Sequence, residues 1–170
     1  EYDYASFVGG YRPRSVENDE GKYDIRYEFV PQIFTNVYVR AWQHPEQHFY
    51  LVIEAINRGN CAEIFGDIFQ LLDREDNYSI IPVEELLNYL IATLGTDTAG
   101  IAGGKMQLPP NLSIYATMNT SDQSLFPMDS AFKRRWEWEY IPISYAADKP
   151  SAQYEVNLDA ERYFYWIEFI

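Results

Sequence analysis

Two short apolar runs, each followed by polar residues, dominate the hydrophobic pattern of this chain. Phe49–Ile53 is unbroken and apolar, which is typical of a buried strand in a parallel sheet. Leu112–Thr117 is predicted as a second buried strand, and the polar Asn119 follows it. Alternating or aromatic-rich stretches predict further strands at Tyr23–Val30 and Trp138–Ile141. The strands are therefore spread along the whole chain rather than gathered in one block.

Helical spacing of apolar positions occurs between these strands. It predicts helices over Phe34–Trp42, Ile64–Asp73, Pro82–Leu94, Met128–Arg134 and Ala160–Ile170. Pro82 suits a first helical turn. Residues 1–21 are rich in Gly, Arg and acids and read as a loop, as does the Gly-rich stretch 96–105. Strands that alternate with helices predict an α/β fold with a mainly parallel sheet flanked by helices.

Composition supports a globular chain with one core. The chain has 170 residues, of which 47% are hydrophobic and 17% aromatic, and this composition is that of a globular and not a disordered chain. No apolar run approaches the roughly 18 residues of a membrane span, so we expect no membrane association. The single cysteine, Cys61, fits a cytoplasmic location and is expected to be a small buried thiol on a helix.

A formal charge of -13 argues against direct clamping of a DNA backbone, which needs Lys and Arg on the surface. Contact with DNA through a local patch or through other domains stays open. Measurable duplex binding that falls steeply with added salt would favour a direct DNA-binding module instead.

The first candidate for chemistry is Glu54, which closes the predicted strand Phe49–Ile53. Ligands bind at the carboxyl ends of strands in open α/β sheets, so a carboxylate there can hold Mg²⁺ beside a triphosphate. An acid at the end of an apolar strand is also common without any such role. Both readings stay open for Glu54 taken alone.

Two further candidates follow along the chain. Asn119 ends the second strand and could orient an attacking water or contact a γ-phosphate, although an Asn at this point could equally cap the next helix. The basic cluster Lys133–Arg135 lies at the end of a predicted helix. Such clusters stabilise the helix dipole, and they also serve as arginine fingers in nucleotide hydrolysis.

The order and spacing of these motifs resemble the McrB-type AAA+ nucleoside-triphosphatases. Leu51–Asn60, followed by Ile64–Asp67, is similar to the family's Walker B segment, and Ala116–Ser124 is similar to its sensor motif. Met128–Trp136 resembles the arginine-finger segment, and Tyr4–Pro13 resembles a stretch that the family places upstream. The resemblance covers most of residues 1–143.

The resemblance implies a role for each matching residue. Glu54 would associate with Mg²⁺, while Asn57 and Arg58 would contribute to nucleotide binding in the same segment. Asn119 would be the sensor and Asp122 would support hydrolysis. Arg134 and Arg135 would be fingers that act on the neighbouring subunit. These seven positions, together with Ala55, form the candidate site.

The resemblance also implies an assembly. Residues 1–143 would form part of an AAA+ core, and 144–170 a linker and the start of a C-terminal helical lid. Members of the family use Mg²⁺ with GTP or ATP, form homo-oligomeric rings, work with a McrC-like endonuclease and meet DNA through other domains. This chain would then be the hydrolysis half of a restriction-system motor.

Two departures from the family pattern matter. Ala55 stands where the family has the Glu that activates water, and a methyl group cannot accept a proton. A phosphate-binding loop needs Gly-x-x-x-x-Gly-Lys-Ser/Thr, and only Gly103–Met106 comes near it. That stretch has Ala99 in place of the first Gly and Met106 in place of the hydroxyl residue.

These departures lead to an expectation and an alternative. The family places the phosphate-loop strand before the segment that this chain matches, so we expect a partial sheet that lacks this strand and a chain that is inactive alone. The alternative function is a catalytically dead AAA+ module kept for oligomer assembly or partner binding.

Overall fold

The computed structural model describes residues 2–73, 78–119, 125–141, 154–157 and 163–165. It divides the chain into two units, Glu1–Trp136 and Glu137–Ile170. In the second unit, β5 (Glu155–Asn157) and β6 (Tyr163–Tyr165) form an antiparallel pair. The helix predicted over 160–170 is therefore wrong at residues 163–165. The strand predicted over Trp138–Ile141 is also wrong, since these residues have no regular secondary structure.

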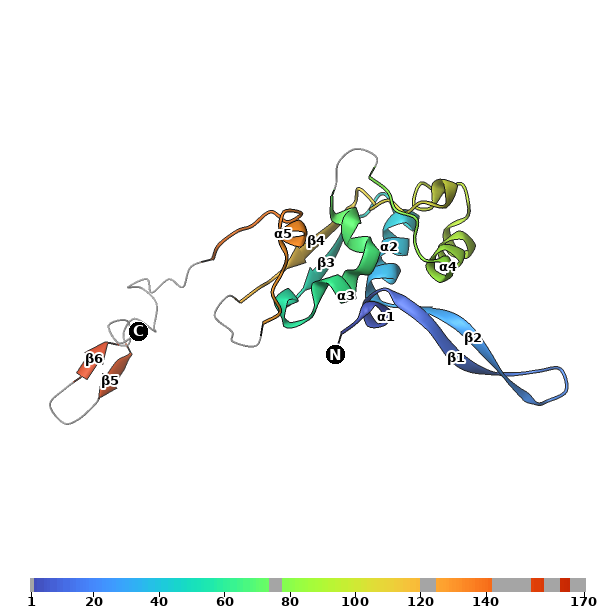
Figure 1. The fold of residues 1–170 in the computed structure, drawn as a ribbon, viewed down its shortest axis with the longest axis horizontal. Coiled ribbons are helices and arrows are strands. Elements are labelled where there is room, and N and C mark those ends of the chain that lie inside the picture. The colour runs from blue at the N-terminus through green and yellow to red at the C-terminus, as the bar shows by residue number, and fades with distance from the viewer. Residues whose placement is uncertain (1, 74–77, 120–124, 142–153, 158–162, 166–170) are drawn as a thin grey trace. The chain divides into compact units, whose positions relative to one another are not determined.

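The first unit contains most of the regular structure (Figure 1). Its helices and strands are, in chain order, α1 (Tyr4–Phe7), β1 (Gly9–Glu17), β2 (Tyr23–Pro31), α2 (Ile33–Gln43), β3 (Phe49–Ile53), α3 (Cys61–Phe65), α4 (Glu84–Leu94), β4 (Leu112–Ala116) and α5 (Ser130–Lys133). Short 3₁₀ helices lie at Ile56–Arg58, Gly66–Leu72 and Ala102–Gly104. No helix in the described part of the chain is long and apolar enough to cross a membrane.

The parallel pair β3–β4 confirms the prediction of a mixed α/β fold with a parallel sheet. Its register runs from Phe49 opposite Leu112 to Ile53 opposite Ala116. The prediction that β3 is a buried strand holds for one of its faces only. Leu51 is 6% exposed, but Tyr50 and Val52 on the opposite face are 62% and 61% exposed. Only one face of the strand packs against the core.

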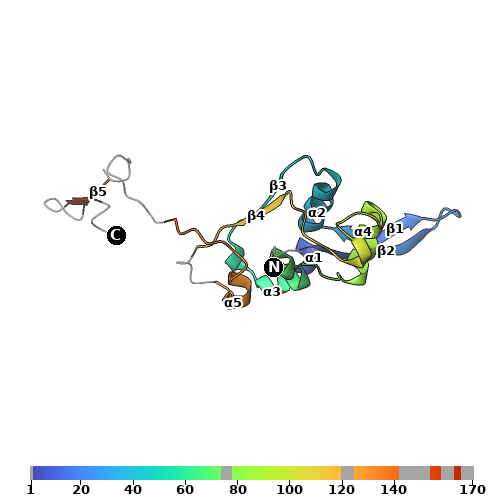
Figure 2. The same ribbon diagram turned by 90° about the horizontal axis from the view of Figure 1, so that it is seen from above.

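The predicted loop over residues 1–21 is wrong. The described residues of this segment contain α1 and β1, and β1 pairs with β2 along its full length, from Gly9 opposite Pro31 to Glu17 opposite Tyr23. Figure 1 and Figure 2 show this hairpin projecting from the rest of the first unit. Because both faces of its outer half are exposed, no burial pattern marks β1 as a strand in the sequence.

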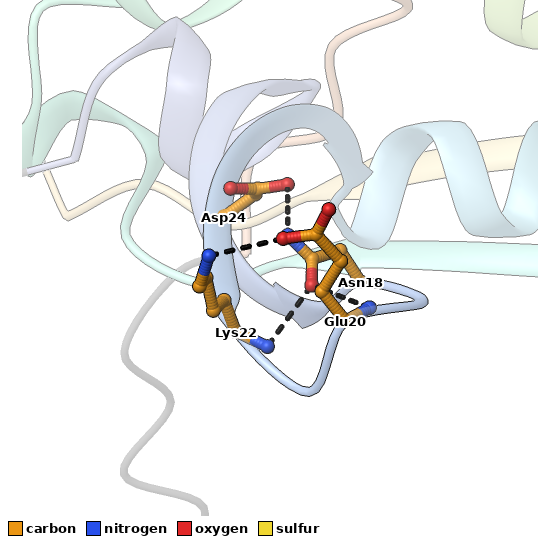
Figure 3. A network of polar contacts seen from close by, with 4 residues as sticks. All are labelled: Asn18, Glu20, Lys22 and Asp24. Atoms are coloured by element: carbon orange, nitrogen blue, oxygen red, sulfur yellow. Dashed lines mark hydrogen bonds and ion pairs between the residues drawn. The ribbon is translucent and has the colours of Figure 1, made fainter.

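The hairpin is ordered at its tip, as Figure 3 shows. Asn18 Oδ1 accepts the amides of Glu20 and Lys22 at 3.1 and 2.9 Å, and Asn18 Nδ2 donates to Asp24 at 3.1 Å. Gly21 supplies the positive φ of 73° that the turn requires.

The core lies beneath α2, α3 and α4. It includes Phe7, Phe34, Tyr38, Phe65, Leu86, Leu90, Met106 and Leu112, all at most 4% exposed. The single amphipathic helix predicted over Ile64–Asp73 is broken at Gly66, where φ is +50°. A Cβ at this glycine would lie 2.8 Å from the Tyr4 ring, so the close approach of α1 requires the glycine as well.

Candidate functional site at the strand ends

The carboxyl ends of β3 and β4 are joined by backbone and side-chain hydrogen bonds. The Thr117 amide donates to the Ile53 carbonyl at 2.9 Å, and the Ile56 amide donates to the Thr117 carbonyl at 2.9 Å. The Ala55 amide donates to Thr117 Oγ1 at 3.1 Å. The structure therefore brings the segments after the two strands together, as the parallel pairing requires.

Asn57 makes the most specific contact between these segments. Its side chain Nδ2 donates to the Asn119 carbonyl at 3.0 Å, and its own carbonyl accepts from the Phe126 amide at 2.9 Å. Asn57 is only 3% exposed, and its Oδ1 has no hydrogen-bond partner in the described part of the chain. A buried amide with these contacts holds the backbone of Asn119 in place. Sequence reasoning grouped Asn57 with nucleotide contacts and missed this positioning role.

Glu54 and Ala55 form the turn that follows β3. Glu54 is exposed, so its carboxylate is accessible from solvent. Ala55 has φ 49° and ψ 52°, a left-handed conformation that costs a residue with a Cβ about 1–2 kcal/mol. Non-glycine residues in this region are found preferentially at functional sites. The strained residue is the one that occupies the position of the expected catalytic Glu.

The two arginines predicted as fingers have different surroundings. α5 begins at an Asp129 cap whose Oδ1 accepts the Phe132 amide at 2.6 Å. Arg134, just after the helix, is exposed. The Arg135 side chain is only 6% exposed, and its Nε lies 3.1 Å from Asp73 Oδ2 in an ion pair not aligned as a hydrogen bond. Its guanidinium carbon lies 4.6 Å from the Phe69 ring centroid.

The remaining predicted residues have simpler outcomes. Arg58 is exposed at the end of the short helix Ile56–Arg58, and Asn119 is exposed after β4. Asp122 lies outside the described residues. Among the described residues, no group of three or more His, Cys, Asp or Glu side chains could hold a metal ion.

Two smaller predictions are confirmed. Cys61 is the first residue of α3 and is 6% exposed, and burial raises the pKa of its thiol. The stretch around Gly103–Lys105 is a 3₁₀ turn followed by an isolated bridge between Met106 and Ile80, not the start of a helix. It therefore has the loop character predicted for it rather than the geometry of a phosphate-binding loop.

Comparison with known proteins gives two relatives. The chain is 38% identical to the type II restriction enzyme BsuMI component YdiS of Bacillus subtilis (strain 168), over 84% of this chain and 46% of that protein. It is 30% identical to the type IV methyl-directed restriction enzyme EcoKMcrB subunit of Escherichia coli (strain K12), over 96% of this chain and 31% of that protein. No family model matches the chain.

The chain thus spans less than half the length of each of these relatives. The alignment with the Escherichia coli subunit nevertheless includes 96% of this chain. The chain is thus a homologue of parts of two restriction-enzyme components, one of which is an McrB subunit.

Proposed function

We propose that this chain is the hydrolysis half of a GTP- or ATP-binding AAA+ site in the motor of a restriction system. The observation that carries the proposal is the junction of β3 and β4, where Glu54, Ala55 and Asn119 follow the carboxyl ends of two parallel strands. This edge of an open α/β sheet is where such folds bind ligands. The two homologues are both named as restriction-enzyme components, which supports the system proposed here.

The residues at the junction fit a magnesium-nucleotide better than a protein-only metal site. Mg²⁺ is commonly held by one or two carboxylates together with substrate phosphates and water. Glu54 offers one exposed carboxylate, and the described residues offer no three-ligand cluster. Bound Mg²⁺ would neutralise charge on the phosphates. We expect Glu54 to hold it and Asn119, fixed by Asn57, to contact the γ-phosphate or the attacking water.

The surroundings of the two arginines favour different roles. Arg134 is exposed and is free to extend toward a neighbouring subunit of a homo-oligomeric ring. Arg135 is buried against Phe69 and Asp73, so its role in this chain is to fix α5. We therefore propose Arg134 as the finger and Arg135 as its support. A McrC-like endonuclease and DNA bound through other domains would complete the system.

Ala55 favours a second candidate, a catalytically dead AAA+ module used for assembly or partner binding. An alanine cannot activate water, and the turn keeps Ala55 in a left-handed conformation. The exposed Glu54 and Arg134 are groups that a scaffold does not need. The two candidate functions differ in whether the other residues needed for nucleotide hydrolysis are still functional.

Restoring the missing acid discriminates the two candidates. In the protein of full natural length, Ala55→Glu should produce phosphate release from Mg-GTP or Mg-ATP if the chain belongs to a disabled motor. Ala55→Gln is the matched control, because it adds nearly the same volume without a base. Equal inactivity of both variants while nucleotide is bound would contradict the motor and favour the scaffold.

A further inference from the structure

The turn after β3 has a backbone conformation that its own residue does not favour. Ala55 lies in the left-handed region, with φ 49° and ψ 52°. Among the described residues it is the one residue other than glycine with a positive φ. An alanine is disfavoured there because its Cβ comes too close to the following carbonyl oxygen. Contacts from the rest of the fold must therefore hold Ala55 in this conformation.

Three hydrogen bonds hold the two peptide groups on either side of Ala55. The Ala55 amide donates to Thr117 Oγ1 at 3.1 Å, and the Ile56 amide donates to the Thr117 carbonyl at 2.9 Å. The Ala55 carbonyl accepts the Arg58 amide at 2.9 Å. Because φ and ψ are set by the orientation of the two flanking peptide planes, these bonds fix the left-handed conformation. Two of the three bonds are made to Thr117.

Thr117 is placed for these contacts by the strand before it. β4 ends at Ala116, and the Thr117 amide continues the parallel pairing by donating to the Ile53 carbonyl at 2.9 Å. Thr117 is exposed, so its side chain does not fill the core. Any residue at this position has a backbone carbonyl, whereas the acceptor for the Ala55 amide is the side-chain hydroxyl. The hydroxyl is therefore the part of the contact that depends on residue type.

A second contact between the same two segments runs in the opposite direction. Asn57, after β3, donates from its side chain to the backbone carbonyl of Asn119, after β4. Thr117, after β4, accepts with its side chain from the backbone amide of Ala55, after β3. Each segment thus uses one side chain to hold the backbone of the other. The two residues held in this way are Ala55 and Asn119, both of which belong to the candidate site.

We propose that Thr117 is a positioning residue for nucleotide hydrolysis, whose hydroxyl fixes the direction of the side chain at position 55 relative to Asn119. The proposal rests on the proposed function, in which position 55 belongs to the acid that activates water. Thr117 acts through the backbone of position 55 and not by contact with the nucleotide. Displacement of a reacting group by about 1 Å can reduce a rate about a hundredfold. The hydroxyl should therefore affect turnover more than folding.

The size of the effect follows from the strain in the turn. The left-handed conformation of a residue with a Cβ is disfavoured by roughly five- to thirtyfold. One neutral hydrogen bond opposes this by roughly two- to tenfold. Without the hydroxyl, the strain at position 55 should release the turn in most molecules. We expect the population with the side chain at position 55 correctly directed to fall about tenfold.

The test uses the protein of full natural length carrying Ala55→Glu, with hydrolysis of Mg-GTP and Mg-ATP measured at steady state. Thr117→Val removes the hydroxyl but keeps the β-branched shape, and it should lower kcat about tenfold with KM changed less than about twofold. Thr117→Ser keeps the hydroxyl and should keep most of kcat. Thr93→Val is the matched control, because the Thr93 hydroxyl donates to the Tyr89 carbonyl within α4 at 2.7 Å. It should leave kcat unchanged.

A second measurement distinguishes failure of this proposal from failure of the proposed function. Hydrogen–deuterium exchange of single amides is followed in the protein with its natural Ala55. Thr117→Val should accelerate exchange of the Ala55 and Ile56 amides about tenfold and leave the Thr117 amide, which is bonded to Ile53, at its original rate. Thr117→Ser should leave all three unchanged.

The outcomes have separate meanings. An inactive Ala55→Glu protein with this exchange pattern would overturn the hydrolysis role and leave Thr117 as the residue that holds position 55. Unchanged exchange of the Ala55 amide in Thr117→Val would overturn the contact itself. Equal kcat with and without Thr117→Val, a rise in KM alone, or an equal loss in Thr117→Val and Thr117→Ser would overturn the positioning role.

Discussion

Replacing Arg135 by alanine should destabilise the first unit far more than the same change at Arg134. The Arg135 side chain is 6% exposed and pairs with Asp73, whose side chain is 32% exposed. Truncation removes this ion pair, a hydrogen bond from the guanidinium to the Ala131 carbonyl and the stacking on Phe69. Loss of one partner of a fully buried pair costs about 3–5 kcal/mol. Since Asp73 keeps partial access to water, we expect about 2–3 kcal/mol.

Arg134 provides the control for this prediction, because it is the neighbouring arginine and is exposed. Arg134→Ala should change the free energy of unfolding by no more than about 0.5 kcal/mol. With a urea m-value of about 2 kcal/mol/M, Arg135→Ala should lower the unfolding midpoint by about 1–1.5 M. Fluorescence-monitored urea unfolding measures both variants. Equal midpoints for the two would refute the assignment of Arg135 as the structural arginine of α5.

Two other residues give further predictions. Burial, with Asp67 and Glu85 nearby, raises the pKa of Tyr4 to about 12 from 10, so the folded state keeps the phenol proton where the unfolded state loses it. The free energy of unfolding should therefore fall as pH rises from 10 to 12, and Tyr4→Phe should make this fall shallower in urea unfolding measured at several pH values. Asn57→Ala should cost about 1–3 kcal/mol, because it removes the buried hydrogen bond from Asn57 Nδ2 to the Asn119 carbonyl. Exchange of the Phe126 amide with deuterium should accelerate, and unchanged exchange would contradict the positioning role of Asn57.

The spacing of apolar residues correctly predicted the helices and strands that have one face in the core. α2, α4 and the paired strands β3 and β4 are present where the apolar spacing placed them. Each has at least one face in the core, so its hydrophobic pattern records its environment. β3 was predicted as a buried strand but is buried on one face only, because an unbroken apolar run does not reveal whether both faces are covered.

The hairpin could not be predicted from its first strand. β1 contains Pro13, and its outer residues are exposed on both faces, so no apolar stripe facing the core marks it as a strand. Its conformation depends on pairing with β2, which the spacing of apolar residues within β1 does not record. The break at Gly66 was missed for a similar reason, since it depends on the approach of Tyr4.

The candidate site was predicted in part. The strand ends were located by the polar residues that follow each apolar run, and the structure joins them through Thr117 and Asn57. Adjacent arginines cannot be distinguished by sequence, because which of them is buried depends on the position of Asp73 and Phe69 around α5. The burial of the Asn57 side chain could not be predicted either, because the sequence gives the residue type but not the direction in which the side chain projects.

Binding of magnesium-nucleotide at the ends of β3 and β4 is the central claim, and calorimetric titration of the protein of full natural length with Mg-GTP and Mg-ATP tests it most directly. Because Ala55 cannot activate water, the heat reports binding without turnover. We predict saturable binding of one of the two nucleotides, weakened about tenfold by Glu54→Gln when Mg²⁺ is present and unchanged by that substitution when Mg²⁺ is chelated. No binding, or equal affinity of wild type and Glu54→Gln with Mg²⁺, would contradict it.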